Sequence, residues 1–301
     1  MCVLKISTVR NLCILCTVCM LLLLVPASCV REDMEECMQY ALNVRAVDNE
    51  GNDLTDSGVL QKADVYLFNE NGFVKMVPSG ISSDFLFGHD KRQKFTLVAW
   101  GNIKKDTMIV TDIKVGTSIE EARLQLRKHA EGSYIPITDI FYCRREMSNT
   151  TTRGMQEENI TLVMERLAAG ISIRTRYLAE RYPYTGEPYT FIVRGTGTEV
   201  DFMGKIVREN AGYRPESTTD NQGDVYAPPF RIFPTEEGGH IEIDIYRNQE
   251  RIYTIVEDND FKPLYVTAGV QTNIDIDFRY AQVKTFVTIV PWGTINQDTE
   301  M

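Results

Sequence analysis

The chain has 301 residues, of which 43% are hydrophobic, and its formal net charge is −10. The hydrophobic content is enough for packed cores and argues against an intrinsically disordered chain, and the length suits two domains of ordinary size. The acidic balance disfavours nucleic acid and anionic membrane surfaces as electrostatic partners.

The first 28 residues have the pattern of a cleaved secretory signal peptide. Lys5 and Arg10 precede an apolar run over residues 12–25, and the small residues Ala27 and Ser28 follow it. This run is shorter than the ~20 apolar residues that a membrane-spanning helix needs. An uncleaved membrane anchor is the alternative interpretation.

Cys29 directly follows the small residues, and Pro26-Ala27-Ser28-Cys29 resembles the lipobox of bacterial lipoproteins. The resemblance implies acylation of Cys29, cleavage before it, and attachment to the outer membrane through acyl chains such as palmitate. A single acyl chain binds a membrane only marginally, so several chains are needed for a firm anchor. An ordinary signal peptide followed by an unrelated cysteine is the alternative.

An acidic run follows at residues 32–36. It resembles the surface-export signal of Bacteroidetes lipoproteins, and a solvated tether is the alternative. After cleavage and acylation, Cys37 and Cys143 would be the remaining cysteines. An oxidising periplasm could join this pair as a disulfide, and two free buried thiols are an equal alternative.

The predicted elements of the first half are mainly strands. Residues 40–46 alternate apolar and polar side chains, residues 64–74 form a hairpin around Asn71-Gly72, and residues 94–100 are an apolar strand. Residues 118–126 are the clearest helix candidate, because Ser118 and Glu121 have capping-box spacing ahead of apolar residues at helical spacing.

The polar segment 144–160 is predicted to be a loop or linker, with the domain boundary near its end. Strands resume at residues 160–164 and 169–175. Apolar side chains alternate again over residues 241–245 and 274–280, and a final strand is predicted over residues 283–290. Strict alternation of apolar and polar side chains is typical of antiparallel sheets with one buried and one solvent-exposed face. The sequence therefore predicts an all-β protein with a signal peptide (1–28) and two antiparallel β-sandwiches (29–160 and 161–301).

Enzyme motifs are not evident. The three histidines, His89, His129 and His240, have no metal-ligand spacing, and residues 195–198 begin like a nucleotide loop but miss its glycine spacing. The acidic segments 48–53 and 257–260 are interpreted as turns and not as calcium loops. We therefore expect no catalytic site, no cofactor and no metal.

Residues 182–189 form an aromatic, proline-containing loop with tyrosines at positions 182, 184 and 189. Exposed tyrosines can stack on sugars or anchor a protein interface. Packing of these rings onto the sandwich is an equally good interpretation.

Several segments, in their order along the chain, resemble the fimbrial anchor lipoproteins of Bacteroidales, which tether fimbriae to the outer membrane. The matching segments are Cys29 with Cys37 after the acidic tether, residues 63–68 with Asn71-Gly72, residues 139–142, residues 164–169 and residues 290–293. Cys143 stands where that family is expected to have a small residue, so a bridge from Cys37 to Cys143 is not implied by the resemblance.

The resemblance implies two transthyretin-like β-sandwiches in tandem and a mechanical role, in which the protein anchors the fimbria and limits its growth. The implied partners are the fimbrial shaft subunits. Shaft subunits of related fimbriae lose a first strand to an arginine-directed protease, whereas an anchor should keep it. Arg45 lies inside the first predicted strand, which agrees with retention. The alternative function is a surface adhesin or fimbrial tip subunit that binds glycan or protein ligands.

The last predicted strand is the candidate contact with the shaft. Val283, Thr285, Val287 and Ile289 form one face of it, and Phe286 and Trp292 lie on or beside the other. A strand that belongs to its own sandwich has the same pattern as a strand donated to a partner. The sequence leaves both interpretations open.

Overall fold

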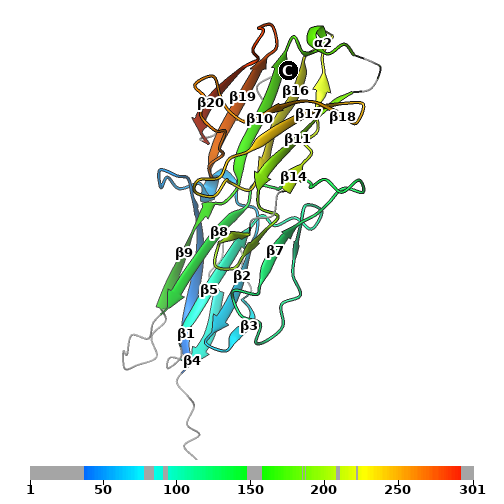
Figure 1. The fold of residues 1–301 in the computed structure, drawn as a ribbon. Helices are drawn as coiled ribbons and strands as arrows, with labels where there is room; N and C mark the ends of the chain where they lie inside the picture. The colour runs from blue at the N-terminus through cyan, green and yellow to red at the C-terminus, as the bar shows by residue number, and fades with distance from the viewer. Residues whose placement is uncertain are drawn as a thin grey trace, which may run out of the picture. The chain divides into compact units, whose positions relative to one another are not determined.

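The computed structural model describes residues 37–77, 85–90, 94–147, 158–184, 186, 188–207, 211–221 and 223–292. Nearly all of its regular structure is β-strand, which confirms the all-β class (Figure 1). The helical segments are η1 (Thr55–Ser57) and α2 (Leu178–Arg181). No helix within the described ranges is long and apolar enough to cross a bilayer. The signal peptide, Cys29 and the acidic run lie outside the described residues.

The largest sheet has seven strands in the order β3-β2-β5-β8-β9-β1-β4. The strands are β1 (Cys37–Val47), β2 (Ala63–Asn69), β3 (Gly72–Val77), β4 (Phe85–Asp90), β5 (Phe95–Gly101), β8 (Phe141–Met147) and β9 (Glu158–Arg166). β8 pairs with β9 at the two positions Phe141↔Arg166 and Tyr142↔Glu165. The sheet therefore divides there into two leaves. Buried side chains of both leaves, such as Leu67 and Leu162, belong to one core.

β2 and β3 form the hairpin that the sequence predicts, with Asn69 opposite Gly72. Gly72 has a φ of +100°, and a Cβ there would lie 2.5 Å from the carbonyl oxygen of Gly116. The position therefore needs glycine both for its backbone conformation and for the close approach of a second loop.

Two strand pairs are parallel, which corrects the prediction of purely antiparallel sandwiches. β1 pairs with β9 in parallel from Tyr40↔Glu158 to Val47↔Glu165. β10 (Ala169–Arg176) and β19 (Val270–Asp277) are the second parallel pair. Alternation of side chains reports which face of a strand is buried, and it carries no information on the direction of the neighbouring strand.

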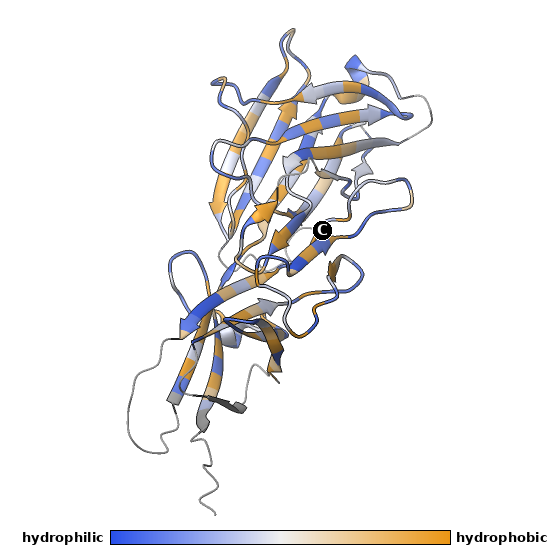
Figure 2. Cartoon of the chain, turned by 60° about the horizontal axis from the view of Figure 1, so that its bottom comes forward, coloured by the Kyte–Doolittle hydropathy of each residue, from blue (hydrophilic) through white to orange (hydrophobic). Residues whose placement is uncertain are grey.

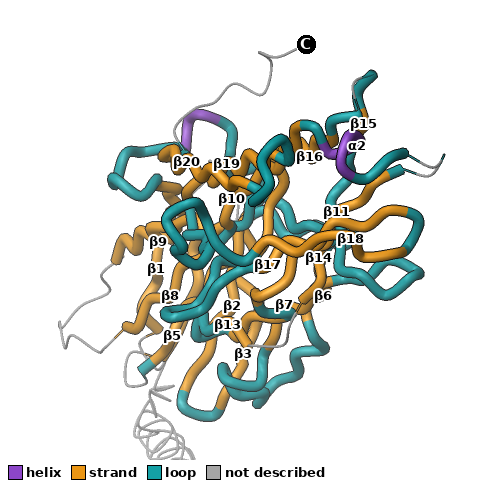
Figure 3. The backbone as a smooth tube through the Cα atoms, turned by 45° about the horizontal axis from the view of Figure 1, so that its top comes forward, coloured by secondary structure: helices purple, strands orange, loops and turns teal. Residues whose placement is uncertain are grey.

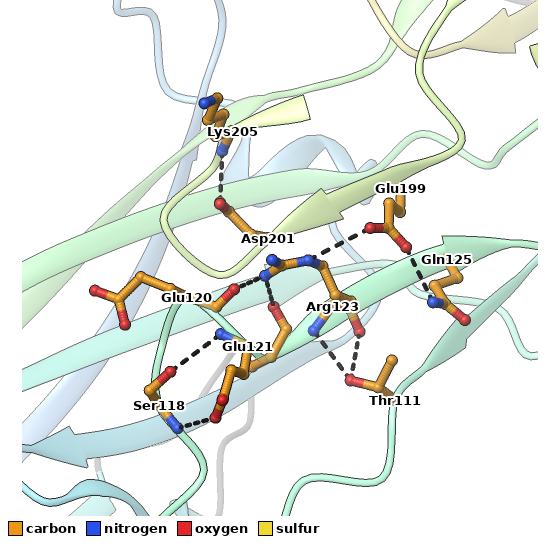
Figure 4. Close-up of polar contacts among 10 residues, drawn as sticks. Thr111, Ser118, Glu120, Glu121, Arg123, Gln125, Glu199, Asp201 and Lys205 are labelled. Atoms are coloured by element: carbon orange, nitrogen blue, oxygen red, sulfur yellow. Dashed lines mark hydrogen bonds and ion pairs between the residues drawn. The ribbon is translucent and has the colours of Figure 1, made fainter. Parts of the chain in front are cut away.

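A small sheet covers the outer face of β2 and β5. Its order is β13-β12-β7-β6, and its strands are β6 (Met108–Val110), β7 (Arg123–Leu126), β12 (Glu199–Asp201) and β13 (Ile206–Val207). β12 and β13 come from the second half of the chain but pair with β7 of the first half. The Nε atom of Arg123 lies 3.4 Å from Glu199 Oε1, and Gln125 Nε2 donates to the same carboxylate at 3.0 Å (Figure 4).

The predicted helix over residues 118–126 is wrong. The capping box does form: Glu121 N donates to Ser118 Oγ at 3.2 Å and Ser118 N donates to Glu121 Oε2 at 3.3 Å (Figure 4). It closes a single turn, after which the chain extends into β7. Ladder bonds to β6 and β12, together with burial of Leu124 and Leu126 at a period of two, outweigh the weak local helix preference.

The second sandwich consists of two sheets, with orders β15-β16-β10-β19-β20 and β14-β11-β17-β18. The strands not yet given are β11 (Tyr189–Thr196), β14 (Ala211–Tyr213), β15 (Thr218–Thr219), β16 (Val225–Ile232), β17 (Glu242–Arg247), β18 (Glu250–Ile255) and β20 (Lys284–Pro291). Polar and apolar residues alternate along many of its strands (Figure 2). Asp244 alternates with the apolar residues of β17 but is itself buried, and it forms ion pairs with Arg194 and Arg251.

The boundary predicted at residues 160–161 falls inside β9, which runs on to Arg166. Leu167 and Ala168 alone separate β9 from β10. The small sheet adds a second connection between the two halves, and the described residues from Met38 onward form one compact unit. Of the segment predicted as a loop or linker, residues 144–147 belong to β8 and residues 158–160 belong to β9, and residues 148–157 lie outside the described residues.

Candidate partner-binding edge

β20 is the end strand of its sheet. It pairs antiparallel with β19 from Asp277↔Lys284 to Val270↔Pro291, and it lies outside β19 in Figures 1 and 3. The predicted last strand is therefore part of its own sandwich. Within the described chain, no strand pairs with its other side.

Along β20, the backbone N–H and C=O groups of successive residues point alternately toward β19 and toward the open side of the strand. Asn259 pairs with both backbone polar groups of Thr285. Its Oδ1 accepts from Thr285 N at 2.8 Å, and its N donates to Thr285 O at 3.1 Å. In an antiparallel edge strand, residues that point away from the neighbour recur at every second position. Val287 and Ile289 thus direct their N–H and C=O groups to the open side, where they can pair with an added strand.

The predicted contact face is only partly exposed. Thr285 is buried, Val283 and Val287 pack against the core, and Ile289 keeps 49% of its surface exposed. Phe286, on the opposite face, is also 49% exposed. The edge therefore combines free ladder groups with exposed apolar side chains.

The acidic turn predicted at residues 257–260 borders this edge. Asp258 Oδ1 accepts from the backbone N–H groups of Asp260 and Lys262, which closes the acidic turn, and Asn259 contacts β20. Phe261 in the same loop has a φ of +61° and is 67% exposed. The acidic turn was recognisable from sequence, but its position beside β20 depends on the fold.

Trp292, the other predicted contact residue, is partly exposed and is held in place by other residues of the chain. Its carbonyl oxygen accepts from Arg166 Nη1 at 3.1 Å, and its ring lies 5.0 Å from the guanidinium of Arg166 and 4.8 Å from that of Arg231. Arg166 Nε also donates to both oxygens of Asp139 at 3.1 Å. Burial raises the pKa of Asp139 and lowers that of Arg231, while the attraction between them opposes both shifts. This group of residues fixes the end of β20.

Arg45 lies within β1, as the sequence predicts. It stands opposite Val163 of β9, and its Nε donates to Asp53 Oδ2 at 2.6 Å. Hydrogen bonds from Thr55, followed by the interaction with Arg45, lower the pKa of Asp53 to about 2. β1 is an interior strand between β9 and β4, so its backbone at Arg45 is not in an exposed loop.

The structure gives no support to a bridge between Cys37 and Cys143. Cys143 is a free thiol in β8, and its neighbour Tyr142 stands opposite Glu165 of β9, which in turn stands opposite Val47 at the end of β1. Cys37 is the first residue of β1, ten positions before Val47, or roughly 30 Å along an extended strand. Disulfides require Cα atoms within about 7 Å. The pairing is left for thiol alkylation to test.

The aromatic loop packs largely onto the sandwich. Tyr189 is buried and its hydroxyl donates to the carbonyl oxygen of Tyr182, whose ring makes an edge contact with Phe278 at 6.0 Å. Tyr184 is the exposed ring of the three, with 52% of its surface accessible. This geometry favours a structural role over a stacking platform.

The other candidate sites are also turns. Gly195 and Thr196 end β11, and Gly197 and Thr198 connect it to β12. Asp48 Oδ1 accepts from the backbone N–H groups of Glu50 and Asn52 at 2.9 and 2.8 Å. Within the part of the chain that the structure describes, no three His, Cys, Asp or Glu side chains are grouped to hold a metal ion.

The fold and the edge define a class: an all-β protein of two joined sandwiches with an accessible strand at one margin. The chain belongs to the family of fimbrillin-A associated anchor proteins Mfa1 and Mfa2, whose model matches residues 34–298. It is 24% identical over 287 residues to the major fimbrium anchoring subunit FimB of Porphyromonas gingivalis W83, covering 90% of this chain and 92% of FimB. The fold resembles that of the fimbrial anchor protein Mfa2 from Porphyromonas gingivalis, with a TM-score of 0.62, 15% identity, and coverage of 85% and 98% of the two chains.

Proposed function

We propose that this chain is an anchor subunit that tethers fimbriae to the cell surface and limits their growth. The observation that carries the proposal is the family match over residues 34–298, supported by similarity to a protein named as a fimbrium anchoring subunit along 92% of its length. An anchor needs an attachment to the envelope and a contact with the shaft, and the two ends of the chain offer candidates for each.

The envelope attachment is the acylated Cys29. Cleavage before this residue and attachment of acyl chains would place the protein in the outer membrane, with the acidic tether leading into β1. The interior position of β1 supports retention of the first strand, because proteolysis at Arg45 would require a segment paired on both sides to open.

The shaft contact is the open side of β20. β20 is already part of its own sheet, so we propose that it receives a strand from a shaft subunit rather than being donated. The outward backbone groups of Val287 and Ile289 would supply the hydrogen bonds, and the exposed side chains of Ile289, Phe286 and Phe261 would supply apolar surface.

The test replaces Ile289 with proline in the chromosomal gene. Proline removes the outward N–H group, and at this position it spares the ladder to β19. The matched control, Ile289→Val, keeps that N–H group. We expect Ile289→Pro cells to hold folded protein in the outer membrane but to shed fimbriae or grow them abnormally long, while Ile289→Val cells resemble wild type.

Two outcomes would contradict different parts of the proposal. Normal co-purification of Ile289→Pro protein with shaft subunits would remove β20 as the contact while leaving the anchoring role intact. A strain that lacks the whole gene yet keeps attached fimbriae of normal length, seen by immunogold microscopy, would refute anchoring itself.

A further inference from the structure

The outer face of the five-stranded sheet carries a polar cleft of about 510 Å³. It lies where β10, β15 and β16 meet the turns that follow β15 and β19. The residues that line it are Arg174, Arg176, Tyr177, Thr218, Asp220, Asp224, Val225, Tyr226 and Arg279. Nothing in the proposed anchoring role uses this cleft.

The three arginines of the cleft differ in their partners. Arg279 donates to Asp277 at 2.6 Å, and Arg176 lies 3.8 Å from Asp275. Arg174 is exposed and forms no ion pair with a carboxylate of the described residues, although its charge, like that of Arg176, opposes the rise that burial causes in the pKa of Asp224. Its guanidinium lies over the ring of Tyr226, 5.4 Å from the centroid. This stacking orients the guanidinium and leaves its donor groups for a ligand.

Tyr177, which also lines the cleft, has an uncommon backbone conformation. Tyr177 has a φ of +60°, and its N–H donates to Asp224 Oδ1 at 2.6 Å. The guanidinium of Arg279 lies 4.6 Å from the centre of the Tyr177 ring. A bulky residue with positive φ is rare in proteins, and such strain is concentrated at functional sites.

We propose that this cleft binds a carboxylate-bearing sugar of an acidic polysaccharide. The planar guanidinium of Arg174 matches a carboxylate with two parallel hydrogen bonds. Asp220 and Asp224 can accept hydrogen bonds from sugar hydroxyls, and Thr218 and the tyrosine rings border the space for the sugar ring. A phosphate would carry more negative charge toward the two aspartates, so their repulsion favours the singly charged carboxylate.

The experiment uses the purified acylated protein in detergent and three immobilised probes, namely polygalacturonate, alginate and polysialic acid. Methyl-esterified polygalacturonate is the matched neutral probe, because it keeps the sugar backbone and loses the charge. The variants are Arg174→Gln and Arg174→Lys, and the control is Arg127→Gln, which changes an exposed arginine outside the cleft. Thermal melting by circular dichroism establishes that each variant is folded.

We expect at least one of the three acidic probes to bind and the methyl-esterified polygalacturonate not to bind. Arg174→Gln should weaken binding about tenfold or more, because it removes a charged hydrogen-bonding partner. Arg174→Lys, which keeps the charge but not the two-pronged geometry, should fall between Arg174→Gln and wild type, and Arg127→Gln should match wild type. Three results would each overturn the proposal. They are no binding to any of the three acidic probes, equal binding of the esterified and unesterified polygalacturonate, and binding by Arg174→Gln as strong as by wild type. Fimbriae should remain attached in an Arg174→Gln strain, so this test is independent of the anchoring test.

Discussion

Phe202 shows how one side chain joins two parts of the chain that are far apart in sequence. Its fully buried ring makes edge contacts with Tyr66 at 4.9 Å, Phe68 at 6.0 Å and Trp100 at 5.6 Å. Its carbonyl oxygen accepts from the hydroxyl of Tyr142 at 3.0 Å. The segment that carries β12 and β13 is thus held on the first sandwich by a buried aromatic cluster.

Phe202→Ala is expected to lower the free energy of unfolding by about 3–5 kcal/mol, because it removes a buried ring and leaves a cavity. Urea unfolding followed by tryptophan fluorescence measures this loss, since Trp100 is part of the cluster. Met203→Ala, at the exposed neighbouring position, is the control and should change stability by less than ~1 kcal/mol. Similar losses for both variants would contradict a specific role for the ring.

Cys143 offers a second measurement at the scale of a residue. Burial raises the pKa of its thiol to about 11, whereas an unfolded cysteine has a pKa of about 8.5. The native thiol is therefore protonated at pH 8. Because the thiol ionises at lower pH in the unfolded state than in the folded state, the free energy of unfolding decreases as pH rises from about 9 through 11.

We expect iodoacetamide to label Cys143 slowly in native protein at pH 8 and rapidly in urea without reductant. Mass spectrometry of the labelled peptides gives both rates, and Cys143→Ala identifies the peptide. A requirement for reductant in urea would instead establish a disulfide and contradict the free thiol seen in the structure.

At the scale of elements, β20 has two roles that can be separated. Its inner side pairs with β19 along the whole strand and covers the margin of the core, where Thr272, Ile274 and Ile276 are buried. Its outer side is the proposed shaft contact. A variant that removes the strand should therefore differ from one that alters its exposed surface.

Removal of residues 284–301 is expected to abolish cooperative unfolding of the second sandwich, because β19 loses one of its two neighbouring strands and apolar core becomes exposed. Limited proteolysis and urea titration measure this effect. The control is Phe286→Ser, which alters a half-exposed side chain and should cost no more than about 2 kcal/mol while unfolding stays cooperative. A stable truncated protein would revive the interpretation of β20 as a donated strand.

At the scale of the molecule, anchoring requires that the envelope attachment and the shaft contact act in one chain. The described residues form one unit in which β9 leads almost directly into β10 and the small sheet adds a second connection. Force applied at β20 would therefore reach β1 through the paired strands β19 and β10, the two-residue connection to β9, and the β9–β1 pairing.

Cys29→Ala tests the membrane attachment of the whole protein. We expect the variant to leave the outer-membrane fraction and to lose labelling with radioactive palmitate, because no thiol remains for acylation at that position. Circular dichroism of the released protein should match that of the acylated protein, since Cys29 precedes the folded strands. Persistence of the variant in the membrane fraction with palmitate attached would contradict the lipobox interpretation.

The amino-acid sequence by itself determined the all-β class and most strand positions. Residues 40–46, 64–74 and 274–280 show a period of two or a glycine turn, and these signals arise within a few neighbouring residues. The family resemblance was also readable, because it depends on the order of short segments along the chain.

The tertiary structure alone decided which strands are neighbours. Alternation in β1 marks its buried face, but the parallel pairing with β9 depends on a strand more than a hundred residues away. Residues 118–126 have a local helix pattern, but the strand hydrogen bonds of β7 with β6 and β12 outweigh that preference. The cleft around Arg174 brings together residues from 174 to 279. Such contacts are invisible to a local pattern, because their free energy comes from partners that only the folded chain brings together.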